Sequence, residues 1–330
     1  MQARNVDAKT LPPPPGIIGS LRAGFDVTAG HITAILLPAA LDLLLWLGPR
    51  LSVGELVQPF LKQVSEMATT GGLKPEDISS AMSMYQQFFQ QFNLLAILRT
   101  FPIGIFSLMS GKLPVQSPLG TPSILEISSP GSFLGLVFLL TLIGWTLGGL
   151  YFRWVAALAT HGETPGTGRT VFQTLLYSLI WLFISWTLGL PAVFLIYIIF
   201  VINTLVGEIV LLILGFISVW LIVPVFFSPH GMFVKKQNAF SSIISSFQLA
   251  RFTLPTTSLF VLTIFLVGFG LNFLWSIPSD SSWLVLVGIL GHAFITTALL
   301  ASSFVYYHGM STWLQTVLTR LRGDVPTQPA

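Results

Sequence analysis

The sequence lacks cysteine altogether and is poor in charge, and each shortage excludes a class of protein. Without cysteine there are no disulfides, no thiolate metal ligands and no cysteine nucleophile. Charged residues make up only 8% of the chain, against about 25% in typical soluble domains. The formal net charge of +3, without a basic run interleaved with aromatics, argues against a nucleic-acid partner. The chain is 53% hydrophobic with a mean hydropathy of +0.81, which predicts an all-α polytopic membrane protein.

Enzyme signatures are also missing from the sequence. It contains no HExxH, no GxSxG, no P-loop and no GxGxxG in a nucleotide-binding context. The run HGET at His161 to Thr164 offers a base and a carboxylate, but positions i and i+2 do not share a helix face. We therefore expect a protein that is not an enzyme and needs no cofactor.

The stretch from Val171 to Phe227 is strongly apolar and contains a single charge, Glu208. A transmembrane helix needs about 20 apolar residues, so this length allows two crossings and is too short for three. Arg169 before the stretch and Lys235 after it are typical of cytoplasmic flanks. We expect a hairpin whose break falls between Gly189 and Gly207, with Glu208 marking the outer turn.

The whole chain is predicted to cross the membrane six times, as three consecutive hairpins with both termini in the cytoplasm. The expected spans are 32–51, 133–157, the two arms of 171–227, 254–275 and 283–307. Residues 1–30 read as a cytoplasmic tail with an amphipathic helix, and 31–330 as a single membrane bundle. Further amphipathic helices are expected between Lys236 and Arg251 and at the C-terminal end. The charge distribution predicts a multi-pass membrane protein with both termini in the cytoplasm.

Residues 52–131 are predicted to form an extracytoplasmic helical cap inserted after the first span. Its first helix should end at Gly71, and its second should begin at Lys74-Pro75. Residues 92–109 are apolar enough to suggest another crossing, but Arg99 and Pro102 favour a segment at the interface. Residues 113–132 read as an extended linker.

The dipeptide His-Gly recurs at three predicted ends of returning helices, at His161, His230 and His308. We interpret each glycine as a left-handed helix cap and each histidine as a favourable charge at the negative end of the helix dipole. The alternative is a metal site formed by the three imidazoles at the cytoplasmic face. The cap is preferred because, apart from Glu163, no acidic partner recurs beside the histidines.

Two ionisable residues are predicted to lie within the membrane, where such groups are functional candidates. Asp42 falls in the first span and His292 in the last, so a pair that relays protons or binds a cation is geometrically possible. The alternative is that each is satisfied internally and only fastens the bundle. A Gly144-xxx-Gly148 pair in the second span would let another helix approach closely.

The run LIVPVFFSPHGMFVKKQNAFSSIISSFQLARF, followed at once by a span, carries a family resemblance. It resembles uncharacterised bacterial six-helix membrane proteins that are similar to the membrane domain attached to some glycerophosphodiester phosphodiesterases. The resemblance covers about residues 165–270. The resemblance implies a six-helix topology in a bacterial inner (cytoplasmic) membrane. It implies no catalytic activity, because no phosphodiesterase catalytic domain is present.

Two functions therefore stand as expectations. The first is a non-enzymatic membrane scaffold, or a subunit that binds lipid or other membrane proteins. The second is a small transporter or channel subunit that uses Asp42 and His292. A water-accessible cavity at Asp42 would favour the second, and a packed, satisfied Asp42 the first.

Overall fold

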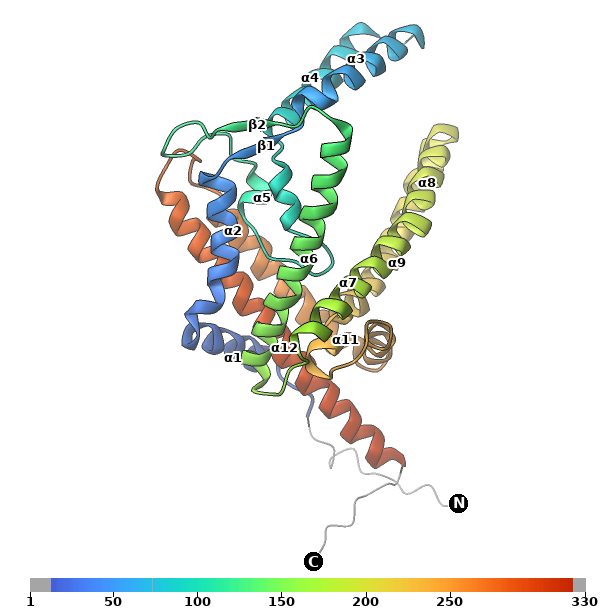
Figure 1. Cartoon of the computed structure of the whole chain (residues 1–330). Helices are drawn as coiled ribbons and strands as arrows, with labels where there is room; N and C mark the ends of the chain where they lie inside the picture. The colour runs from blue at the N-terminus through green and yellow to red at the C-terminus, as the bar shows by residue number, and fades with distance from the viewer. Residues whose placement is uncertain (1–12, 73, 323–330) are drawn as a thin grey trace, which may run out of the picture. The chain divides into compact units, whose positions relative to one another are not determined.

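The computed structural model describes residues 13–72 and 74–322 and is built almost entirely of helices (Figure 1). The predicted tail at residues 1–12 and the last eight positions, 323–330, lie outside the described residues. The chain forms two compact units. Unit 1 contains the described residues up to His31, with Phe152–Gly268 and the chain from Thr297 onward. Unit 2 contains Ile32–Tyr151 and Phe269–Thr296.

Unit 2 begins with the short 3₁₀ helix η2 (Ile32–Ile35) and the helix α2 (Leu36–Leu47). The strand β1 (Arg50–Ser52) then pairs in parallel with β2 (Ile124–Glu126), with Arg50 opposite Ile124. The predicted first span to residue 51 is therefore too long, and the predicted linker contains a strand. The chain ends α2 early because Gly48 and Pro49 interrupt the helix.

The region predicted as a helical cap begins with a pair of helices, α3 (Gly54–Thr70) and α4 (Pro75–Gln91). Gly72 after α3 has a φ of +80°, which a residue without a Cβ adopts at no steric cost. Pro75 begins α4, where the missing N–H costs nothing. Both helix boundaries agree with the prediction.

Residues 92–109 do not cross as a helix. They form the 3₁₀ helix η3 (Leu94–Leu98), an irregular stretch and the start of the short helix α5 (Met109–Lys112). Leu98, Ile105, Leu108 and Met109 are buried in the core of unit 2 with Trp46 and Ile289. These apolar side chains pack against residues of α2 and α12 inside the unit. Irregular backbone at membrane depth is tolerated when protein buries it in this way.

Unit 1 contains the helix α1 (Ile17–Gly30) and the end of α6 (Pro130–Thr160). An antiparallel hairpin follows, whose first arm is α7 (Thr167–Ile184), the π-helical turn η4 (Ser185–Gly189) and α8 (Leu190–Ile202). Its second arm is α9 (Thr204–Phe227), and the short helix α10 (His230–Val234) comes after it (Figure 1). A π-helical turn fits the sequence here because Pro191 has no N–H for a regular helical bond.

The two arms of the hairpin are joined by one residue, Asn203, which lies between Gly189 and Gly207, where the break was predicted. Asn203 leaves the helical conformation, with φ −155° and ψ 111°, and its side-chain oxygen accepts the N–H of Val206 at 3.1 Å. Gly207 lets the two arms meet, because a Cβ there would lie 2.7 Å from the ring of Phe200. Glu208 is exposed, close to this turn, as predicted.

The last two helices of the described chain are α11 (Ala239–Trp275) and α12 (Leu284–Arg322), which contribute to both units. The amphipathic helix predicted between Lys236 and Arg251 is not separate but forms the first part of α11. The predicted C-terminal surface helix likewise continues α12. Pro255 lies within α11 without ending it, and Trp275 and Trp283 bracket the short connection as predicted.

Four described helices are long and apolar enough to cross a membrane, namely Pro130–Thr160, Thr167–Ile202, Ala239–Trp275 and Leu284–Arg320. Two broken pairs raise the number to six if each counts as one span: Ile17–Gly30 with Ile32–Leu47, and Thr204–Ser218 with Trp220–Val234. The class of an all-α, multi-pass membrane protein is therefore confirmed by length and composition.

The three His-Gly dipeptides do not mark three equivalent helix ends. Only His161 follows the end of a span, and there the histidine itself is left-handed, with φ +48°. His230-Gly231 begins α10, and His308-Gly309 lies inside α12. The prediction of a repeated cap is wrong because helix α12 continues through its dipeptide and packing buries His230.

Candidate functional site

Asp42 is the most deeply buried ionisable group of unit 2, with none of its side chain exposed. It lies on the face of α2 that also carries the buried Ala39, Leu45 and Trp46. The helical spacing of these residues places the carboxyl group inside the core, where a polar group without partners is costly.

The carboxyl group of Asp42 accepts three hydrogen bonds from one short segment. The hydroxyl of Ser107 donates to Oδ1 at 2.5 Å, and the N–H of Met109 donates to the same oxygen at 3.0 Å. The N–H of Leu108 donates to Oδ2 at 3.0 Å. Asp42 thus caps the beginning of α5 from another helix and supplies the acceptor that these backbone donors need.

His292 of α12 lies beside this carboxyl group, as the pairing hypothesis required. Its Nδ1 is 3.8 Å from Oδ2 of Asp42, which is too long for a hydrogen bond. The His292 side chain is 9% exposed. The order of contacts is serine to aspartate to histidine, so the histidine does not contact the serine hydroxyl as a general base must. The structure has a small cavity beside α7, lined in part by Arg169, and a second cavity at the end of α3, lined in part by Gly71. Neither Asp42 nor His292 lines either cavity.

The segment that Asp42 caps is also held by α6, through the predicted pair of small residues. A Cβ on Gly148 would lie 2.7 Å from Cα of Gly104, and one on Gly144 would lie 2.8 Å from the carbonyl oxygen of Leu98. Trp145, between them, donates its Nε1–H to the carbonyl of Phe101 at 3.2 Å. The close approach was predicted, but its partner is irregular chain and not a helix.

A second set of polar contacts fixes the connection between α11 and α12 in unit 2. The Nζ of Lys112 lies 2.8 Å from the carboxylate of Asp280 and donates to the carbonyl of Pro278 at 2.7 Å. Trp46 donates its Nε1–H to the carbonyl of Asp280 at 2.8 Å. The connection between α11 and α12 is thereby tied to both α2 and α5.

The other predicted candidates do not converge. His161 and His308 are exposed, whereas His230 is buried and its Nε2 lies 2.8 Å from the hydroxyl oxygen of Ser303. In residues 13–72 and 74–322, no three His, Asp or Glu side chains come together as a metal site. The hypothesis of a three-histidine metal centre therefore finds no grouping in the part of the chain that the structure describes.

Sequence reasoning missed Ser107, which is the hydroxyl partner of Asp42. A signal was available, because Ser107 and Ser110 have the Ser-x-x-Ser spacing of a helix start, and Ser107 Oγ accepts the N–H of Ser110 at 3.0 Å. No local pattern could have linked this start to Asp42, which lies far away along the sequence. Comparison with protein-family models, with curated proteins and with solved structures gave no match.

Proposed function

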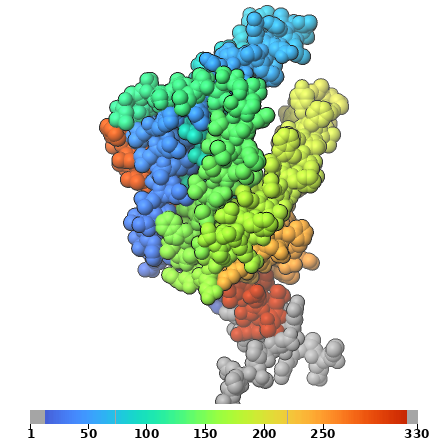
Figure 2. Space-filling view, viewed as in Figure 1, coloured from blue at the N-terminus to red at the C-terminus, as the bar shows by residue number. Residues whose placement is uncertain are grey.

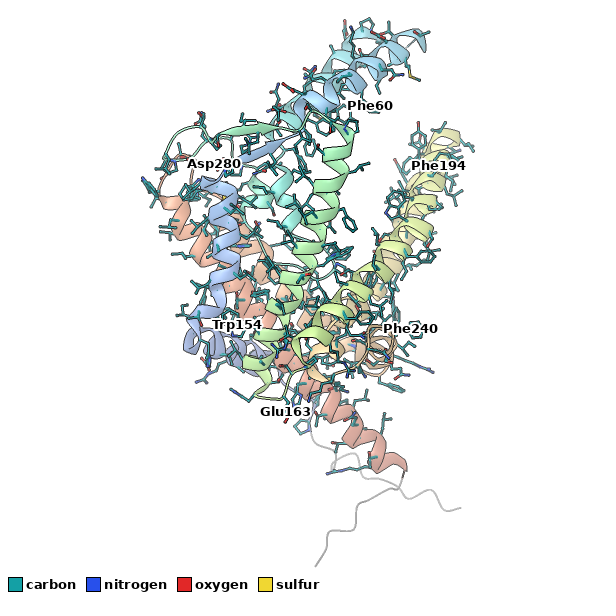
Figure 3. The ribbon with its side chains drawn as sticks, in the orientation of Figure 1. Phe60, Trp154, Glu163, Phe194, Phe240 and Asp280 are labelled. Carbon is teal, nitrogen blue, oxygen red and sulfur yellow. The ribbon has the colours of Figure 1, made fainter. Side chains whose placement is uncertain are left out.

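We propose that this protein is a six-span, non-enzymatic scaffold of the bacterial inner membrane that associates with other membrane proteins through the α7–α9 hairpin. One observation carries the proposal. Of the residues between Leu179 and Ile222 whose burial the structure describes, only Gly207 is buried. Figure 2 shows the α8 end of this hairpin as exposed surface, and Figure 3 shows Phe194 projecting from α8.

The length of the hairpin supports a role beyond crossing the bilayer. The helical stretch Thr167–Ile202 has 36 residues, which corresponds to about 54 Å at 1.5 Å per residue. The hydrocarbon core is about 30 Å thick, and spans tilt by about 20° on average. The arm therefore has more apolar length than a crossing needs, and apolar surface in excess of that need is typical of interaction sites.

Contacts at the base of the hairpin support an even number of crossings. The Nζ of Lys236, after α10, lies 2.9 Å from the carboxylate of Glu163, before α7. Arg169 donates to the carbonyl of Lys236 at 2.6 Å. Both ends of the hairpin therefore lie on one side of a membrane, so α7–α8 and α9 both cross it or neither does. Six spans follow if both cross and α2 crosses as well.

Single cysteines can test this topology, because the natural chain contains none. We expect Ser279→Cys, between α11 and α12, and Ser65→Cys, on α3, to react with a membrane-impermeant maleimide added outside the cell. Glu163→Cys should react only after permeabilisation. Labelling of Glu163→Cys and Ser279→Cys from the same side would contradict the six-span arrangement.

Photo-crosslinking tests the scaffold function itself. A photoreactive amino acid at Ile213 on α9, which is 51% exposed, should give discrete protein adducts in native membranes. The matched control is Leu139 on α6, an apolar position that is 52% exposed and is expected to give lipid adducts only. Lipid adducts alone at both positions would reject the hairpin as a docking element.

The transporter hypothesis keeps one supporting observation, the proximity of Asp42 and His292. Against it stands the use of both Asp42 oxygens in contacts within unit 2. The resemblance to bacterial six-helix membrane proteins remains a proposal about family.

A further inference from the structure

The two arms of the α7–α9 hairpin are irregular at the same distance from the turn at Asn203. In the first arm, the N–H of Leu190 donates to the carbonyl of Ser185, five residues back, which makes η4 a π-helical turn. This turn lies 14–18 residues before Asn203. In the second arm, the stretches Thr204–Ser218 and Trp220–Val234 are inclined at 42° to each other, and the break between them lies 15–17 residues after Asn203. Because each residue advances both arms by about 1.5 Å, the two irregularities lie at one level of the hairpin.

A proline accompanies each irregularity. Pro191 follows η4, and Pro224 lies inside α9. Proline has no N–H, so the carbonyl four residues earlier in a helix loses its donor. These two carbonyls belong to Thr187, which lies 16 residues before Asn203, and to Trp220, which lies 17 residues after it. The backbone hydrogen bonding is therefore weakened in both arms at this same level.

A hydroxyl group in each arm also bonds to the backbone of its own helix here. Thr187 Oγ1 donates to the carbonyl of Phe183 at 2.7 Å, and Ser218 Oγ donates to the carbonyl of Gly215 at 2.7 Å. Side-chain hydroxyls that bond in this way compete with the helical backbone and often bend helices. We call this part of the hairpin, which consists of η4 and residues 218–224, the hinge level.

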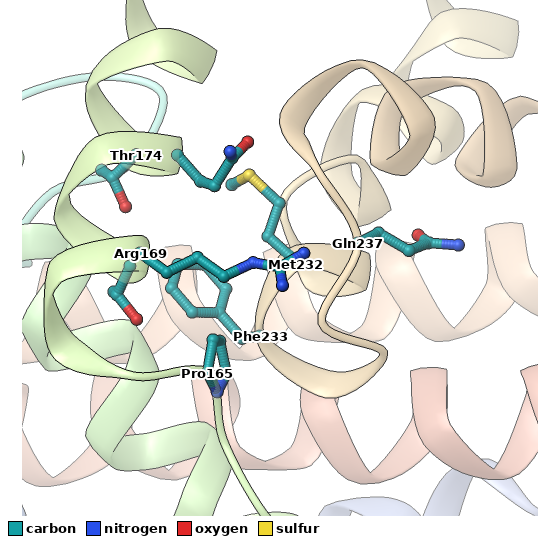
Figure 4. Close-up of a pocket in the computed structure, with 8 residues that line it drawn as sticks. Pro165, Arg169, Thr174, Met232, Phe233 and Gln237 are labelled. Carbon is teal, nitrogen blue, oxygen red and sulfur yellow. The ribbon is translucent and has the colours of Figure 1, made fainter.

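The part of the hairpin between its two ends and the hinge level is fixed within unit 1, and we call it the base. Tyr177 of α7 is completely buried there, and its hydroxyl forms a hydrogen bond with the hydroxyl of Ser228 after α9. Arg169 and Thr174 of α7 line a small cavity together with Met232 of α10 (Figure 4). Contacts between the two arms and with α10 therefore hold the base in place.

The part of the hairpin beyond the hinge level, residues 190–217, has no such packing, and we call it the distal half. Only Gly207 is buried among these residues. Its close approach is to Phe200, so the contact joins the two arms of the distal half to each other. A segment with few buried contacts moves at a low cost in free energy.

We propose that the hinge level is a pivot about which the distal half swings as one body while the base stays in place. Hinges of this kind consist of a few residues that absorb the change in backbone angles. Because both arms are weakened at one level, they can bend together without breaking the contact between Gly207 and Phe200. The pivot lets the exposed arm change its tilt to meet a partner. That use of the pivot rests on the docking role proposed for the hairpin, whereas the motion itself does not.

The test measures distances between pairs of spin labels on the purified full chain in phosphatidylcholine nanodiscs, by double electron–electron resonance. The natural chain has no cysteine, so each labelled pair can be introduced alone. The spanning pair, Phe172→Cys with Tyr197→Cys, places one exposed position on each side of the hinge level. The distal pair, Ile202→Cys with Phe216→Cys, places exposed positions on the two arms of the distal half. We expect the distance distribution of the spanning pair to be at least about twice as wide as that of the distal pair.

Stiffening the hinge level should remove this difference. Replacing Pro191 and Pro224 together with alanine should bring the width of the spanning pair to within about 1.5 times that of the distal pair, because each alanine restores a helical N–H. Deleting Leu188 as well removes the extra residue of the π-helical turn and should narrow the distribution further. Pro255→Ala is the matched control, because Pro255 lies inside α11 of the same unit and outside the hairpin. The width of the spanning pair should not change in this control.

Equal widths for the spanning and distal pairs in the natural chain would overturn the pivot. A width of the spanning pair that the two alanines leave unchanged, or that Pro255→Ala narrows equally, would overturn it as well. Photo-crosslinking at Ile213 reports separately on docking. A mobile distal half without protein adducts would reject the docking role and keep the pivot, and adducts from a rigid distal half would do the reverse.

Discussion

Replacing Asp42 with alanine is expected to lower the free energy of unfolding by about 3–5 kcal/mol, which should appear as a melting temperature several degrees lower in detergent. The substitution leaves three buried donors without an acceptor, namely the hydroxyl of Ser107 and the N–H groups of Leu108 and Met109. It also releases the start of α5 from α2. The free energy of unfolding of Asp42→Asn should lie between those of the natural protein and Asp42→Ala. The asparagine amide keeps one acceptor oxygen but turns its NH₂ group toward other donors.

Asp26 supplies the control for this prediction. Its side chain is 72% exposed and its ion pair with Arg22 is long, at 3.7 Å. Asp26→Ala is expected to change the free energy of unfolding by less than about 1 kcal/mol, as surface ion pairs do. If Asp42→Ala melts like the natural protein, Asp42 does not hold the α5 segment. Asp42 would then remain a candidate for relaying protons or binding a cation in a transporter.

Substituting Gly148 with alanine should lower the free energy of unfolding by about 1–3 kcal/mol, the usual cost of overpacking a core. The added Cβ would lie 2.7 Å from Cα of Gly104, and both partners are backbone atoms that cannot rotate away. The double variant with Gly144→Ala should cost more, since a Cβ on residue 144 would lie 2.8 Å from the carbonyl oxygen of Leu98.

Gly135→Ala is the control on the same helix. A Cβ there meets nothing within 4 Å, so the substitution should be neutral or slightly stabilising, because alanine favours the helix over glycine. Thermal melting of the three variants in one detergent separates the two effects. Equal melting temperatures for Gly135→Ala and Gly148→Ala would show that α6 does not approach the chain at Gly104 this closely.

Asp42 and Gly148 contact the same irregular segment from two different helices. The irregular chain between Leu98 and Met109 has no ladder of its own to satisfy its backbone. Asp42 accepts hydrogen bonds at one end of it, while Gly144 and Gly148 admit it against α6 at the other. We therefore regard Asp42 as a structural residue whose carboxyl group holds this segment against α2 within unit 2.

The apolar composition by itself determined the class, the position of the long helices and the hairpin around Asn203. These follow from the requirement that each span satisfy its backbone internally and bury apolar side chains, which is a local property of about 20 residues. The end of α3 and the beginning of α4 were predictable because Gly72 and Pro75 act on their own turns, which is also a local property. Asp42 and His292 lie close together as predicted, but His292 Nδ1 and Asp42 Oδ2 are 3.8 Å apart, too far for a hydrogen bond.

Only the tertiary structure decided what the polar residues do. Ser107 and Asp42 are far apart in sequence, and no periodic pattern links a helix to an irregular segment that it caps. The His-Gly dipeptides looked equivalent along the chain, yet packing buries His230, leaves His161 at a helix end and carries α12 through His308. Thr170 and Thr174 read as ordinary residues of a span, and only the fold shows that the hydroxyl groups of both are buried without a hydrogen-bond partner in the described chain. Hydrogen-bond partners in a membrane protein are chosen by three-dimensional proximity, and a linear pattern records only which groups will need one.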